Sequence, residues 1–236
     1  MPRRRRIDTA GLPFHVLNRA VARVRLFSTD GDYRAFEKVL AETARRIPME
    51  IFVYCLMPNH WHLIVRPAHA GDLSEFMRLL TVTHVQRWHA AHRTAGTGAL
   101  YQGRFRSFPI ENDNYLLTAC RYVERNPLRA GLVRHAEEWP WSSLSSRLAG
   151  DSDRLLAPWP FEHSRDWLAY LNAALTPTEE AALRESMARG APFGTPEWQA
   201  RTASQLGLEF TLRHRGRPRK AGAEGKDSRP LFQSGS

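Results

Sequence analysis

Two histidines, His60 and His62, lie one residue apart in the apolar stretch CLMPNHWHLIVRP at residues 55–67. If this stretch is a strand, both imidazoles share one face of the sheet and Trp61 points to the other. Two neutral imidazoles on one face could supply half of a metal site. Ten histidines in 236 residues give roughly 0.4 such pairs by chance. A pair of buried, hydrogen-bonded histidines is therefore an alternative interpretation.

Tyr122 and Asn126 are the second pair of residues whose types and spacing could do chemistry. Four residues apart on a helix, they would project from one face with Cβ atoms ~5–6 Å from each other. The Asn126 amide oxygen can ligate a metal, and the Tyr122 hydroxyl can attack a phosphorus whose phosphate is polarised by a cation. Two ordinary interpretations stay open: Asn126 precedes Pro127 and could cap the helix, and Tyr122 could be a core aromatic.

The elements that must position these residues follow from periodicity and turn signals. The order is strand, helix, strand, strand, helix, strand and a final helix, at residues 13–19, 29–46, 49–57, 60–65, 71–93, 101–110 and 114–125. Asn112 or Asp113 would cap the last helix, and Pro127 and Gly131 would close it. This order predicts an α+β fold, a ferredoxin-like βαββαβ sheet with an added C-terminal helix that carries the tyrosine and a mostly helical C-terminal extension.

The charge balance favours a polyanionic partner. The chain has 34 Lys+Arg against 24 Asp+Glu, a net charge of +10. Almost all of the basic residues are arginines, whose planar forks match phosphate oxygens. A genome that favours arginine codons is the alternative explanation. Three basic groups are candidate DNA contacts: a flexible arm (Arg3, Arg4, Arg5, Arg6), an alternating strand (Arg104, Arg106) and an AT-hook-like segment (Arg215, Arg217, Arg219).

We therefore divide the chain into a basic arm (1–12), a main domain (13–148), a helical extension (149–212) and an AT-hook-like segment with a disordered tail (213–236). Cys55 and Cys120 do not form a disulfide framework, which favours the cytoplasm. The longest apolar run, IFVYCLM, is too short to span a bilayer. We expect a soluble, nucleoid-associated protein without a membrane partner.

The segments MPNHWHLIV, YQGRFRSFPI and YVERNPLRAGLVRHAEEWPWSS resemble the REP-associated tyrosine transposases, relatives of the single-tyrosine HUH transposases of bacterial insertion sequences. The resemblance covers roughly residues 8–148 and is specific because the motifs recur in the same order. It implies a metal-dependent single-stranded DNA endonuclease and strand transferase. Its substrates would be palindromic, REP-like hairpins, and it would act as a monomer or a homodimer.

The resemblance also assigns roles by position. His60, His62 and Asn126 match the metal ligands, and Tyr122 matches the nucleophile that forms a 5′-phosphotyrosine bond. Two nitrogen ligands suit Mn²⁺ at least as well as Mg²⁺. Tyr115, two helical turns earlier, is the alternative nucleophile but lacks an Asn or Gln four residues later.

Two other functions stay open. A non-catalytic hairpin-binding protein of the same fold is the main alternative. A zinc hydrolase would need a third His, Asp or Glu near the pair.

Overall fold

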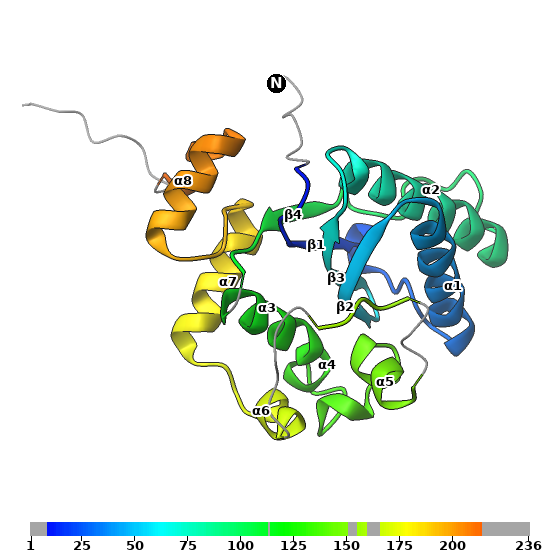
Figure 1. The fold of residues 1–236 in the computed structure, drawn as a ribbon. Coiled ribbons are helices and arrows are strands. Elements are labelled where there is room, and N and C mark those ends of the chain that lie inside the picture. Colours follow the sequence, from blue (N-terminus) through cyan, green and yellow to red (C-terminus); the bar gives the residue numbers. More distant parts are fainter. Residues whose placement is uncertain (1–8, 113, 151–154, 160–165, 214–236) are drawn as a thin grey trace, which may run out of the picture.

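The computed structural model describes residues 9–112, 114–150, 155–159 and 166–213. Its centre is a four-stranded sheet of order β2-β3-β1-β4 in which every neighbouring pair is antiparallel. The strands are β1 (Phe14–Arg19), β2 (Met49–Met57), β3 (His60–Pro67) and β4 (Arg106–Pro109). Helix α1 (Asp30–Arg46) joins β1 to β2, and helix α2 (Asp72–His92) joins β3 to β4 (Figure 1). The predicted ferredoxin-like βαββαβ order is confirmed.

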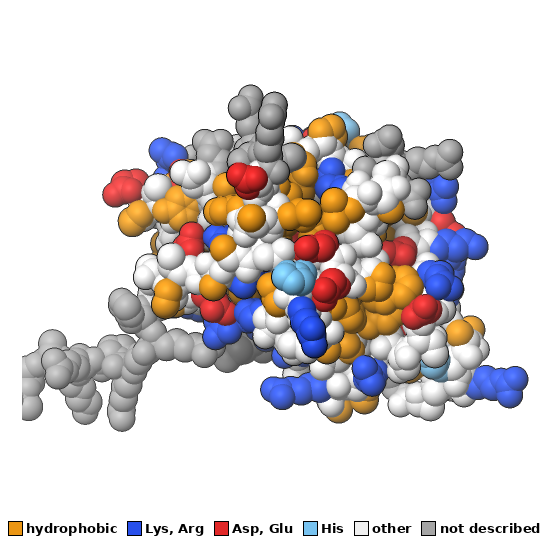
Figure 2. Space-filling view, turned by 90° about the horizontal axis from the view of Figure 1, so that it is seen from below, with side chains coloured by type: hydrophobic (Ala, Val, Ile, Leu, Met, Phe, Trp, Pro, Cys, Tyr) orange, Lys and Arg blue, Asp and Glu red, His pale blue; other side chains and the backbone are white. Residues whose placement is uncertain are grey.

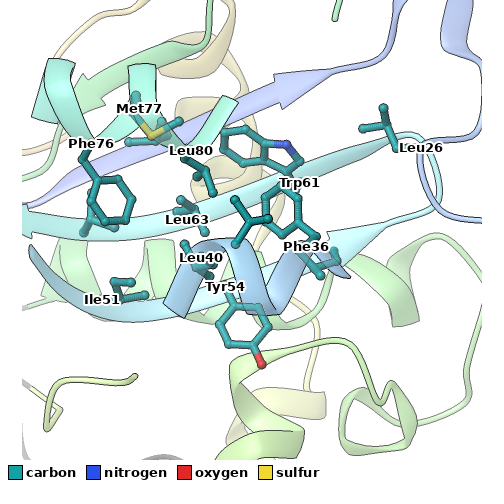
Figure 3. Packing of buried hydrophobic residues seen from close by; sticks show 14 of the residues in the cluster. Leu26, Phe36, Leu40, Ile51, Tyr54, Trp61, Leu63, Phe76, Met77 and Leu80 are labelled. Atoms are coloured by element: carbon teal, nitrogen blue, oxygen red, sulfur yellow. The ribbon is translucent and has the colours of Figure 1, made fainter. Parts of the chain in front are cut away.

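One face of the sheet is covered by α1 and α2. Thr29 caps the start of α1, because its hydroxyl accepts from the Asp32 backbone N–H while the Asp32 carboxylate accepts from the Thr29 backbone. The helices bury Phe36, Leu40, Phe76 and Leu80 against strand side chains (Figure 3). Removal of this apolar surface from water stabilises the layer that supports the central strand β3.

Trp61, the strand residue between the two histidines, is anchored in the core. Its side chain is completely buried in this core, and its indole N–H donates to the Tyr101 hydroxyl at 3.0 Å. The Tyr101 hydroxyl also lies 2.7 Å from Nδ1 of the buried His84. Because successive strand residues point to opposite faces, anchoring Trp61 turns His60 and His62 toward the other face.

The opposite face is covered by α3 (Asn114–Glu124), which packs against β2 and β3 (Figure 1). A β-bulge between Ile51 and Val53 turns Phe52 and Val53 both toward this side. The predicted 114–125 helix is nearly right, but Pro127 does not end it. Instead Asn126 and Pro127 start a one-turn helix, α4 (Asn126–Arg129), because proline is favoured in the first helical turn.

The predicted strand at 101–110 is only partly right. Regular pairing covers Arg106–Pro109, and Tyr101 makes an isolated bridge to Ala20. Between them the chain bends at Gln102 and Gly103, so Arg104 lies outside the strand. Alternation of side chains alone could not reveal this interruption.

A short 3-10 turn (Val21–Arg23) precedes α1, and another (Ala136–Glu138) follows α4. The rest of the described chain is mostly helical, as predicted, with α5 (Ser143–Leu148), α6 (Trp167–Asn172), α7 (Pro177–Arg189), α8 (Pro196–Leu206) and α9 (Glu209–Leu212). Helix α7 packs against α3 and β4. Cys55 and Cys120 are buried and free. None of the described helices is long and apolar enough to cross a membrane. The domain boundaries at 148 and 212 remain predictions.

Glu124, at the end of α3, is a buried acid whose hydrogen bonds favour the protonated, neutral carboxyl. Burial raises its pKa to about 8, although hydrogen bonds from Ser143 and the Leu144 backbone act in the other direction. The Ser143 hydroxyl lies 2.6 Å from Glu124 Oε1 and 3.1 Å from the Tyr54 carbonyl oxygen. A hydroxyl has one proton and cannot donate to both oxygens. A protonated Glu124 resolves this conflict by donating to Ser143.

We expect Glu124→Gln to flatten the pH dependence of stability. The folded-state pKa of about 8 lies above the ordinary 4.5, so the wild-type contribution is present below pH ~4.5 and is lost as the pH rises toward 8. The loss reaches on the order of 5 kcal/mol. Thermal melts by circular dichroism at pH 5, 7 and 9 should show the melting temperature of the variant rising relative to the wild type. Parallel curves would contradict a neutral Glu124.

Candidate active site

A cleft of about 400 Å³ brings together the predicted histidines and the predicted nucleophile. His60 and His62 of β3 and Tyr122 of α3 all line it. The cleft therefore lies where α3 crosses the sheet face that carries the histidines, between segments about 60 residues apart in sequence. Residues of β1, of the 102–106 segment and of α7 also line it.

The charged side chains that line this cleft, besides its histidines, all have one sign. Its lining includes five arginines and no acidic residue, among the described residues: Arg19, Arg104, Arg106, Arg129 and Arg184. By contrast, acidic and basic side chains are interspersed on the face seen in Figure 2. A concave surface with cations and no carboxylates concentrates anions such as phosphates.

The two histidines are held as neutral rings. Burial, with smaller contributions from Arg19 and Arg129, lowers the pKa of His60 to about 4. Burial also lowers the pKa of His62 well below its ordinary value, together with the charges of His15 and His60. The ring centroids of His60 and His62 are 5.0 Å apart. Neutral imidazoles are the form that can ligate a metal ion.

Tyr122 is enclosed rather than free in solvent. Its side chain is 3% exposed, and the Arg129 guanidinium lies over its ring, 4.6 Å from the centroid. Arg129 also donates from Nη2 to Oδ1 of Asn126, which is buried beside it. The candidate nucleophile, the candidate amide ligand and the Arg129 guanidinium thus form one cluster at the α3–α4 junction.

Helix α7 supplies one wall of the cleft through Arg184, Met187 and Ala188. Glu180, on the same helix, pairs with Arg129 at 3.2 Å and with Arg184 at 2.7 Å. The helical extension therefore contributes directly to the environment of Tyr122.

His60 and His62 fit the cation that the resemblance implies, whereas Asn126 fits it only conditionally. Nδ1 of His60 lies 2.7 Å from Asn59 Oδ1, and Nδ1 of His62 lies 2.8 Å from His15 Nε2, so each ring keeps Nε2 for another partner. Asn126 fits only if Arg129 releases its oxygen; its Nδ2 is buried without a partner among the described residues. The described residues contain no metal-binding group of three His, Cys, Asp or Glu, so a zinc hydrolase finds no such ligand set there.

The other predicted site residues fall into three groups. Tyr115 is not on the cleft; its ring packs edge-on against Phe193, with centroids 5.1 Å apart. Arg104 and Arg106 line the cleft and are exposed. The remaining candidates lie outside the described residues: Arg3, Arg4, Arg5, Arg6, Arg215, Arg217 and Arg219.

Sequence reasoning missed four residues around the site. Arg19 and His15 share the strand face of Leu17, which pairs with His62; their alternation was visible, but their pairing partner was not. Arg129 lies one helical turn after Asn126, a spacing that could have been noticed. Arg184 carries no local signal that would connect it to the cleft.

Comparisons with known proteins point in one direction. The family model described as "Transposase IS200 like" matches residues 9–126. The REP-associated tyrosine transposase of Escherichia coli is 26% identical over 147 residues, which cover 62% of this chain and 84% of that protein. A protein of the same class from Haemophilus influenzae is 25% identical over 151 residues, covering 60% of this chain and 84% of that protein.

A solved structure is similar in fold. It is the structure of a REP-associated tyrosine transposase bound to a REP hairpin, with a TM-score of 0.53 and 22% identity. The match covers 70% of this chain and 96% of that one. At this identity the likeness establishes the fold, and it agrees with the sheet described above.

Proposed function

Because this chain belongs to the family of IS200-like transposases, we propose that it is a metal-dependent single-stranded DNA endonuclease and strand transferase. Its substrates are palindromic, REP-like hairpins, and its product is a 5′-phosphotyrosine at Tyr122. The observation that carries the proposal is the shared cleft, in which Tyr122, His60 and His62 are surrounded by arginines. The REP hairpin bound by the solved relative supports the choice of substrate class.

The reaction exchanges one phosphodiester bond for another. The Tyr122 hydroxyl loses its proton as its oxygen bonds to phosphorus, the bond from phosphorus to the 3′-oxygen breaks, and the departing oxygen takes up a proton to become a 3′-hydroxyl. Because the phosphotyrosine keeps the bond energy, the 3′-hydroxyl of another strand can reverse the step, which a water nucleophile would not allow. A divalent cation, Mg²⁺ or Mn²⁺, held by His60, His62 and Asn126 would polarise the phosphate and align it for in-line attack.

Arg129 has two roles in this scheme. Over the Tyr122 ring it restrains the nucleophile, and its charge can stabilise the negative charge that builds up on the phosphate. Its guanidinium must first leave the Asn126 oxygen, so binding of the phosphate and release of the amide are coupled. Glu180, which already pairs with Arg129, can hold the side chain during this exchange.

A covalent-adduct assay tests the function. Purified protein is incubated with Mg²⁺ or Mn²⁺ and labelled single-stranded hairpin oligonucleotides, including palindromes from the host genome, and analysed on a denaturing gel. We expect a protein–DNA adduct that needs the cation and disappears with a chelator. Tight hairpin binding without any adduct would instead identify a non-catalytic hairpin-binding protein of this fold.

The cleft arginines should set the salt dependence of binding. Replacement of Arg104 and Arg106 with Gln removes two exposed cations from the cleft. On single-stranded DNA each lost phosphate contact should reduce the slope of log K against log salt by about 0.7. Titrations of a labelled hairpin followed by fluorescence anisotropy, at salt concentrations from about 50 to about 300 mM, give this slope.

The matched control replaces Arg34 and Arg87 with Gln. Both are exposed arginines of the α1–α2 layer and pair with Asp30 and Glu42. This control lowers the net charge by the same two units away from the cleft. An equal change of slope in both double variants would mean that net charge, and not the cleft, governs binding.

A further inference from the structure

A third histidine, His15, stands directly behind the histidine pair. It lies on β1 and is completely buried, and its ring is nearly parallel to that of His62, with ring centroids 5.0 Å apart and an interplanar angle of 11°. Phe108 of β4 closes the other side edge-on, with centroids 4.9 Å apart. His15 does not line the cleft, so it is placed to act through His62.

The contact between the two rings is specific. His15 Nε2 lies 2.8 Å from His62 Nδ1. The other nitrogen of His15, Nδ1, is buried and has no hydrogen-bond partner among the described residues. Buried polar atoms are normally paired, because an unpaired one loses its hydration without compensation. A histidine kept only for packing would not need this arrangement, since an apolar ring of similar size could fill the space.

The same nitrogen is engaged in both histidines of the pair. In His60 the partner of Nδ1 is the Asn59 side-chain oxygen, which can only accept, so the proton is on Nδ1 and the lone pair is on Nε2. For His62 the partner is another imidazole, which can accept at Nε2 when its own proton is on Nδ1. Histidines that bind metals usually donate their second ring N–H to such a partner, which fixes both tautomer and orientation.

We propose that His15 is a positioning residue that accepts the Nδ1 proton of His62 and so holds the Nε2 lone pair of His62 available to a cation in the cleft. The inference rests on the proposed function for the identity of that ligand. It assigns a role to a residue that does not line the cleft.

The test compares His15→Phe, which fills the space without accepting a proton, with His15→Gln, whose amide oxygen can replace Nε2 as the acceptor. Mn²⁺ binding to the full chain is measured without DNA by electron paramagnetic resonance of the free ion. We expect His15→Phe to weaken Mn²⁺ binding by roughly 10- to 100-fold, the usual effect of losing such a partner. His15→Gln should stay within about threefold of the wild type.

The matched control is His84→Phe. His84 is also buried and hydrogen-bonded, to the Tyr101 hydroxyl at 2.7 Å, but it lies in the core on the other face of the sheet and does not line the cleft. It should leave Mn²⁺ affinity unchanged even if it lowers the melting temperature. Equal loss of affinity in His15→Phe and His84→Phe, or no loss in His15→Phe, would overturn the proposal.

A metal-free readout separates this inference from the proposed function. Long-range ¹H–¹⁵N spectra of histidine-labelled protein, assigned with His62→Gln, report which nitrogen of His62 carries the proton. We expect the Nδ1–H form in the wild type and in His15→Gln, and a shift to the Nε2–H form in His15→Phe. If wild-type His62 carries its proton on Nε2, the proposal is wrong. If the spectra are as expected but the wild type binds no Mn²⁺, the metal-dependent function fails while the positioning role stands.

Discussion

Replacement of Tyr122 with phenylalanine should abolish the covalent DNA adduct while hairpin affinity stays within about twofold of the wild type, since only a nucleophile is removed. The ring is 3% exposed and packs in the cluster beneath α3, and this packing does not need the hydroxyl. The contact with the Arg129 guanidinium also depends on the ring. Removal of a nucleophile typically lowers the rate by a factor of roughly 10⁴ or more. Quantitative adduct formation and anisotropy titrations on one hairpin measure the two effects.

The control for this variant is Tyr115→Phe. Tyr115 packs edge-on against Phe193 and does not line the cleft, so its hydroxyl should be dispensable for the adduct. An adduct that survives in Tyr122→Phe and disappears in Tyr115→Phe would reverse the assignment of the nucleophile. Equal loss of hairpin binding in both variants would mean that the tyrosines serve the fold or the DNA interface instead.

The second large effect is expected from Arg129→Met, which keeps most of the side-chain length and removes the charge. Arg129 lies over the Tyr122 ring and donates to the Asn126 oxygen. Its loss should lower the rate of adduct formation by about 10²–10³-fold, as for other groups that stabilise charge in a transition state. Hairpin affinity should fall by less than about tenfold, because one phosphate contact among several is lost. Single-turnover cleavage at saturating protein separates the rate from the affinity.

Arg184→Met is the matched control for Arg129→Met. Arg184 lines the same cleft and pairs with the same Glu180 oxygen, but it projects from α7, and no contact between it and the Tyr122 ring is found. We expect its rate to fall much less than that of Arg129→Met. Equal losses of rate in the two variants would mean that Arg129 only attracts DNA and does not act on the reacting phosphate. A faster Arg129→Met would show that its contact with Asn126 restrains the enzyme.

Local patterns were enough to predict most of the fold. The alternation through HWHLIV assigned His60 and His62 to one face, because the side-chain period of a strand is set by its backbone geometry alone. Helical periodicity placed α1, because its apolar residues recur at the spacing that the helix backbone sets. The errors occurred where local signals compete: Pro127 can end one helix or begin another, and the bend at Gln102–Gly103 interrupts an otherwise strand-like alternation.

The sequence by itself therefore determined the histidine pair, the candidate nucleophile, the order of the elements and the basic character of the molecule. Tertiary structure alone decided that His15 contacts His62, that Arg129 lies over Tyr122 and that α7 forms a wall of the cleft with Arg184. These contacts join residues on separate elements, and in two of the three cases residues 47 or more positions apart. No periodicity or spacing rule acts over such separations, because strand pairing and helix packing alone determine which distant side chains come together.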